Sequence, residues 1–80
     1  MTGQIHSLIA GMPVSDLDAS VAWYTRFFGR PPDMRAGREM LWDVAEHATL
    51  FIEPRPDHAG AGRATFAVTG LDAPLRVNLG

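Results

Sequence analysis

Residues 13–20, Pro13-Val14-Ser15-Asp16-Leu17-Asp18-Ala19-Ser20, decide the fold of this chain because they join an expected strand to an expected helix. The strand covers residues 5–14, where Gly11 and Pro13 interrupt any helix. Apolar residues alternate along this segment with the period of a half-buried strand. The apolar face carries Leu8, Ala10, Met12 and Val14, and the second face carries Ile5, Ser7, Ile9, Gly11 and Pro13.

The helix is expected to begin at Ser15, whose hydroxyl can accept a hydrogen bond from the Asp18 N–H while the Asp18 carboxylate reaches back. Apolar residues then recur at helical spacing, and Gly29 supplies a stop. The stripe consists of Leu17, Val21, Tyr24 and Phe28, with Trp23 and Phe27 widening it. Aromatic side chains at this spacing favour a place in the core over a ligand pocket.

The middle of the chain predicts a small sheet. Residues 31–38 are polar and rich in proline, which indicates a turn or a short irregular strand. Residues 39–44 and 49–53 alternate and predict a hairpin, closed by the polar residues 45–48. Residues 54–62 hold two prolines and two glycines and predict a loop.

A weak internal repeat divides the chain. Residues 63–69 alternate as a further strand, and residues 67–73 resemble residues 13–19, because both join a strand end to a Leu-Asp-Ala helix start. We therefore expect a first βαβββ module in residues 1–62. Residues 63–80 are expected to hold the first strand and a truncated helix start, at residues 70–75, of a second module. That strand has lost its own partners and is expected to pair with the chain's first strand or with a neighbouring chain.

Composition excludes several classes of protein. The 80 residues are 46% hydrophobic and 20% charged, which is typical of a globular chain and not of a disordered one or a coiled coil. A net charge of −2 gives no reason to bind nucleic acid or an acidic membrane surface. Cysteine is absent, so disulfides and thiolate metal sites are excluded. No apolar run could span a membrane, and we expect a cytoplasmic protein.

This ordered set of motifs resembles the vicinal oxygen chelate superfamily, which includes glyoxalase I, bleomycin resistance proteins and extradiol dioxygenases. The residues that carry the resemblance are 13–20, Ala22-Trp23-Tyr24, Phe28-Gly29-Arg30-Pro31-Pro32, Phe51-Ile52-Glu53-Pro54 and 66–73. The resemblance implies an α+β fold with a mixed curved sheet and one main helix. In this family the sheet forms half of a cleft, and two modules usually close it.

The resemblance also implies where metal ligands would lie. The family's first histidine position falls on Ile9, its first glutamate on Glu53 and its second histidine on Arg63, while the last glutamate would lie beyond Gly80. His6 would point to the opposite face of the strand from Ile9. We therefore expect no metal and no other cofactor. A site built from His6, His47, His58 and Glu53 is the alternative.

Six residues are candidates for the binding cleft: Ile9, Trp42, Phe51, Glu53, Arg63 and Thr65. Glu53 has three interpretations, as a general base with a raised pKa, as the partner of Arg63 in an ion pair, or as a solvated carboxylate. Trp42 either stacks on a flat ligand or lies in the core or in a dimer contact.

The function expected from these residues is a metal-independent module that binds or sequesters a small hydrophobic or aromatic molecule, rather than an enzyme. The alternatives are a metal-dependent lyase, isomerase, transferase or dioxygenase of the glyoxalase type, and a purely structural dimerisation module. A lone module leaves one sheet face and one strand edge uncovered. A homodimer is therefore expected.

Overall fold

The computed structural model describes residues 3–68 and 75–79 of the chain. The expected strand is β1 (Leu8–Val14), which starts later than the alternation predicts, and the expected helix is α1 (Leu17–Phe28). Gly29 ends α1 at a positive φ of 76°, and its N–H donates to the Thr25 carbonyl at 2.9 Å. Glycine adopts this left-handed conformation without steric cost, so the predicted stop is confirmed. No helix among the described residues is long and apolar enough to cross a membrane.

The start of α1 corrects the sequence analysis by one residue. Asp16, and not Ser15, has the extended backbone of an N-cap, with φ −128° and ψ 108°. Its Oδ1 accepts a hydrogen bond from the Ala19 N–H at 3.1 Å. Because the chain turns from strand to helix at Asp16, the predicted Ser15–Asp18 capping box is wrong.

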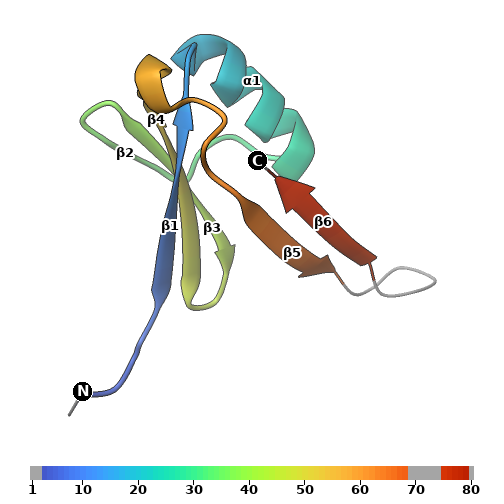
Figure 1. The fold of residues 1–80 in the computed structure, drawn as a ribbon. Coiled ribbons are helices and arrows are strands. Elements are labelled where there is room, and N and C mark those ends of the chain that lie inside the picture. Colours follow the sequence, from blue (N-terminus) through green and yellow to red (C-terminus); the bar gives the residue numbers. More distant parts are fainter. Residues whose placement is uncertain (1–2, 69–74, 80) are drawn as a thin grey trace.

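Four strands form one mixed sheet beneath the helix (Figure 1). Their order is β1-β4-β3-β2, where β2 is Met34–Ala36, β3 is Glu39–Ala45 and β4 is Ala48–Pro54. β1 runs parallel to β4, and the other pairs are antiparallel. The predicted hairpin and the α+β fold are confirmed, and of the two alternatives for residues 31–38 the short strand is the one that forms, as β2. A short 3-10 helix, η1 (Pro56–His58), lies within the predicted loop.

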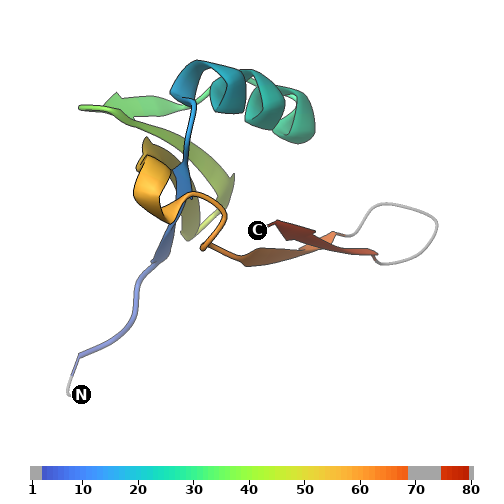
Figure 2. The same cartoon turned by 45° about the horizontal axis from the view of Figure 1, so that its top comes forward.

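The chain then forms a separate hairpin of β5 (Ala64–Val68) and β6 (Leu75–Leu79). Figures 1 and 2 show this hairpin extending away from the four-stranded sheet. β5 pairs antiparallel with β6, and not with β1 as the sequence analysis allowed. The predicted helix start falls on residues 70–74, which lie outside the described residues, and on Leu75, which begins β6.

The core lies between α1 and one face of the sheet. Its buried side chains are Met12, Tyr24, Trp42, Leu50 and Ile52, and the half-buried Val14, Leu17, Val21, Phe28, Met40, Val44, Ala64 and Phe66 pack around them. The main stripe of α1 is therefore confirmed, and so are Met12 and Val14 on the predicted apolar face of β1, whereas Leu8 on that face is 67% exposed. Trp23 and Phe27 stack on each other at 5.3 Å and are 45% and 38% exposed, so they lie at the margin of the core.

Tyr24 makes the stability of this core sensitive to alkaline pH. Burial raises the pKa of its hydroxyl above the ordinary value of 10.0. Tyr24 is the single tyrosine, the basic residues are all arginine and cysteine is absent, so no other side chain titrates between about pH 9 and 12. Since the unfolded chain ionises first, we expect the free energy of unfolding to fall as the pH rises through 10.

Urea unfolding between pH 8 and pH 11 measures this effect. The wild-type midpoint should fall across this range, whereas the midpoint of Tyr24→Phe should stay nearly constant. An equal alkaline loss in both proteins would contradict the assignment to Tyr24.

Candidate functional site

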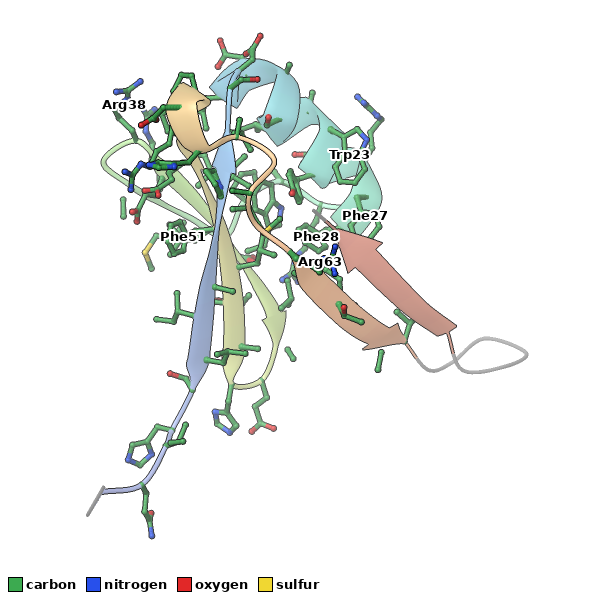
Figure 3. The ribbon with its side chains drawn as sticks, in the orientation of Figure 1. Trp23, Phe27, Phe28, Arg38, Phe51 and Arg63 are labelled. Carbon is green, nitrogen blue, oxygen red and sulfur yellow. The ribbon has the colours of Figure 1, made fainter. Side chains whose placement is uncertain are left out.

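The face of the four-stranded sheet directed away from α1 is the candidate functional site. The strand registers place Gly11 beside Phe51, Phe51 beside Leu41 and Leu41 beside Met34. Cross-strand neighbours share one face, so these four residues form a row across all four strands. Figure 3 shows Phe51 on the side of the sheet opposite to the helix aromatics. We call this row the apolar row.

Phe51 lies directly on the backbone of β1. A Cβ atom built on Gly11 would lie 2.3 Å from Cζ and 2.7 Å from Cε2 of the Phe51 ring. Real Cβ atoms do not approach carbon so closely, because dispersion attraction becomes repulsion well before that distance. Gly11 is thus the residue that lets the aromatic ring lie across the sheet and form a flat apolar surface.

Polar pairs flank the apolar row on both sides. On one side the Thr49 hydroxyl donates a hydrogen bond to Asp43 Oδ1 at 2.9 Å. On the other side Glu53 Oε1 lies 3.8 Å from Arg55 Nη1. Thr49 and Glu53 both lie on β4, four residues and therefore about 13 Å apart. This arrangement suits a flat apolar body with polar groups at its ends.

The structure brings together three of the six residues predicted for the cleft. Ile9, Phe51 and Glu53 lie on this face of the sheet. In the β1–β4 register, Ile9 lies beside Thr49, Phe51 beside Gly11 and Glu53 beside Pro13. Glu53 pairs with Arg55 and not with Arg63. Arg63 lies exposed just before β5, and Thr65 lies in β5 opposite Asn78 in the ladder, so both belong to the separate hairpin.

Trp42 lies in the core, which is one of the positions that the sequence analysis left open. It is 0% exposed, its ring lies 5.8 Å from that of Tyr24 and 5.5 Å from that of Phe28, and its Nε1 donates to the Arg30 carbonyl at 3.0 Å. Every one of these contacts is on the helix side of the sheet. A ligand on the open face therefore does not touch this ring.

Sequence analysis missed six residues of the site: Gly11, Met34, Leu41, Asp43, Thr49 and Arg55. Leu41 had a signal, because the alternation over residues 39–44 already places it opposite to the face of Trp42. Met34 and Arg55 had none, since a three-residue strand and a loop residue have no periodicity.

The described residues do not fit a metal. No group of three or more histidine, aspartate or glutamate side chains among residues 3–68 comes together as a metal site. His47 lies 3.6 Å from Glu46, and His58 lies 3.4 Å from Asp57, each as a separate exposed pair. Ile9 offers no ligand atom, and Glu53 is paired with Arg55. Metal-free binding stays a prediction for elemental analysis.

A double-mutant cycle tests the contact between Gly11 and Phe51. We expect Gly11→Ala to cost about 1–3 kcal/mol of unfolding free energy, because the new methyl group overlaps the ring. In a Phe51→Ala background the same change should cost much less, since the space is then empty. Urea unfolding of the four proteins gives the coupling energy. Equal costs in both backgrounds would show that the ring does not lie on Gly11.

Comparisons with known proteins bear on the fold of this chain. No protein-family model matches the chain, and no curated protein sequence matches it. A solved structure, the glyoxalase/bleomycin resistance protein from Catenulispora acidiphila DSM 44928, is 38% identical with a TM-score of 0.63. The alignment covers 68% of this chain, and the chain spans half the length of that solved structure. This chain therefore has the fold of the vicinal oxygen chelate superfamily, in its glyoxalase and bleomycin resistance form.

Proposed function

We propose that this chain is a module that binds or sequesters a small aromatic or flat apolar molecule without a metal. The supporting observation is the Phe51 ring lying on Gly11, on a sheet face that α1 does not cover. A planar ligand can stack on such a ring, which contributes about 0.5–1.5 kcal/mol beyond the burial of apolar area.

The neighbours of Phe51 favour the same ligand chemistry. Leu41 and Met34 continue the apolar row, and the unbranched methionine side chain adapts to ligands of different shape. Arg55 is half exposed and, with one carboxylate beside it, can orient a polar or anionic substituent of the ligand. The row therefore supplies affinity, and its ends supply orientation.

The binding unit of this proposal is a homodimer. The similar solved structure is named a glyoxalase/bleomycin resistance protein, a name that favours recognition of small molecules, and this chain spans half its length. One sheet face alone leaves a bound molecule open to water, whereas sites for small molecules usually bury most of the ligand surface. A second copy would close the cleft. The absence of cysteine suits a cytoplasmic setting, and neither nucleic acid nor a membrane is part of the proposal.

Naphthalene serves as the test probe because it is flat, apolar and uncharged. Titration followed by amide NMR shifts should perturb residues of β1, β3 and β4 around Phe51. We expect Phe51→Ala to raise the Kd at least about tenfold, through the loss of stacking and apolar contact. Phe27→Ala is the matched control, since it makes the same change in an exposed ring on α1. Loss of binding in Phe27→Ala, or no binding to the wild type, would reject the site.

Elemental analysis separates this proposal from metal-dependent catalysis. After dialysis against a chelator, we expect no stoichiometric zinc, nickel, iron or manganese and unchanged naphthalene binding. About one metal per chain that disappears in Glu53→Ala would instead support the glyoxalase-type alternative.

A further inference from the structure

A second groove lies on the helix side of the four-stranded sheet. It is bordered by the C-terminal end of α1, the last residues of β3 and strand β5, and its volume is about 470 Å³. This volume is within the range of roughly 300–1,000 Å³ that is usual for small-molecule sites. Val44 lines the groove and packs on the core, whereas Phe51 lies on the opposite side of the sheet (Figure 3). We call this second site the helix-side groove.

Aromatic rings from two distant parts of the sequence line the helix-side groove. Phe27 and Phe28 come from the last turn of α1, and Phe66 comes from the middle of β5. The ring centroid of Phe66 lies 6.1 Å from that of Phe27 and 5.9 Å from that of Phe28. These distances are usual for aromatic pairs, so the three rings form one cluster. A planar aromatic molecule in the groove can extend this cluster.

The same cluster joins the hairpin of β5 and β6 to the rest of the chain. Among the described residues of this hairpin, Ala64 and Phe66 are the apolar side chains that pack on the core. Ala67 and Val68 continue β5 along the groove. A bound molecule would therefore contact the hairpin on one side and α1 with β3 on the other, and it would hold these parts together.

Arg30 supplies hydrogen-bond donors to the groove. It follows α1 directly after Gly29, it lines the groove, and its side chain is 49% exposed. Its Nη2 donates both to Asp33 Oδ2, at 2.9 Å, and to the Asp43 carbonyl. The N–H groups of Nε and Nη1 have no partner in the part of the chain that the structure describes. These groups can donate to an oxygen atom of a ligand.

The carboxylates near Arg30 are engaged by other groups. Asp33 Oδ2 accepts from the Asp43 N–H at 2.7 Å as well as from Arg30. The Asp43 carboxylate accepts from the Thr49 hydroxyl on the open face, because Asp43 alternates along β3 with Val44. Asp43 therefore borders the groove with its backbone, and Arg30 is the charge that the groove offers. Since Asp33 balances part of this charge, the groove suits a single carboxylate better than a doubly charged phosphate.

We propose that the helix-side groove binds a small aromatic carboxylate. The aromatic body lies against Phe28 and Phe66, and the carboxylate accepts hydrogen bonds from the free N–H groups of Arg30. Hydrogen bonds between ionised partners are shorter and stronger than those between neutral groups. Apolar contact thus supplies affinity, and Arg30 supplies the preference for a negative charge. This site is separate from the apolar row and does not depend on the function proposed for that row.

Three probes with one ring system and different charges test this preference: 2-naphthoate, naphthalene and 2-naphthylmethylammonium. Amide NMR shifts of Val44 and residues 66–68 report binding in the groove. The Trp42 indole N–H is a further reporter, because it donates to the Arg30 carbonyl. At neutral pH and low salt we expect 2-naphthoate to bind at least about fivefold tighter than naphthalene, and the ammonium probe to bind weakest. Equal affinities of the three probes, or the reverse order, would overturn the proposal.

The variant Arg30→Gln tests whether this side chain selects the charge. The change removes the guanidinium, so the affinities of 2-naphthoate and naphthalene in the groove should become equal within about twofold. Arg26→Gln is the matched control, because Arg26 carries the same charge in the last turn of α1, is exposed and does not line the groove. This control should retain the preference for 2-naphthoate. A preference that persists in Arg30→Gln, or that is lost in both variants, would contradict the proposal.

Arg30 also holds the segment after α1 to β3, so circular dichroism must show that Arg30→Gln still folds. If it does not fold, intermolecular nuclear Overhauser effects in the wild type decide. They should connect the ring protons of 2-naphthoate to the side chains of Phe28, Val44 and Phe66. Effects to Phe51 alone would place the probe on the open face and reject the groove.

The two sites are assessed separately, because shifts around Phe51 report the open face and shifts of residues 66–68 report the groove. Binding of 2-naphthoate in the groove without binding of naphthalene at Phe51 would support this proposal and reject the proposed function. Binding of naphthalene at Phe51 without binding of 2-naphthoate in the groove would do the reverse.

Discussion

The burial of Trp42 is the constraint on which the rest of the structure depends. Its ring contacts Tyr24 and Phe28 of α1 from the sheet below, and its indole N–H is satisfied by the Arg30 carbonyl, just after the helix ends. Arg30 in turn donates to Asp33 and to the Asp43 carbonyl, and Asp33 accepts from the Asp43 N–H at 2.7 Å. Trp42 thus packs against α1 in the core, while a polar network holds the segment that follows the helix to β3.

The core lies on one side of the sheet only. A single helix covers a single sheet face, and only five side chains in the described part of the chain are buried. At this size a domain buries only about 60% of the surface that its unfolded chain exposes, so its free energy of unfolding is small. The uncovered apolar side chains are not scattered, however. They form three groups: Ile9 and Met34 lie on the open face with Phe51, Ile5 and Leu8 lie at the N-terminal end of β1, and Trp23 and Phe27 stack on each other on α1.

Local patterns predicted most of the fold. Alternation placed Met12 and Val14 in the core, helical spacing placed Tyr24 and Phe28 there, and Gly29 marked the helix end. The cap was wrong by one residue because Ser15 and Asp16 are both good caps, and only the backbone angles select between them. The open face was predicted in part, since Phe51 and Ile9 follow from alternation, whereas the closeness of Phe51 to Gly11 depends on strand register, which no local pattern fixes. β6 alternates as Leu-Arg-Val-Asn-Leu, but five residues are too few to distinguish a strand from a helix start.

In the proposed homodimer, ligand binding and assembly are linked. A molecule lying on the apolar row would reach β1, where the Phe51 ring lies directly on Gly11. A second copy would cover the molecule that lies on this open face. Any ligand that contacts both copies must then tighten the dimer by the same factor by which dimerisation tightens ligand binding, because the two equilibria share one thermodynamic cycle. In a chain with so small a core, such coupling would make the ligand a determinant of folding stability as well as of assembly.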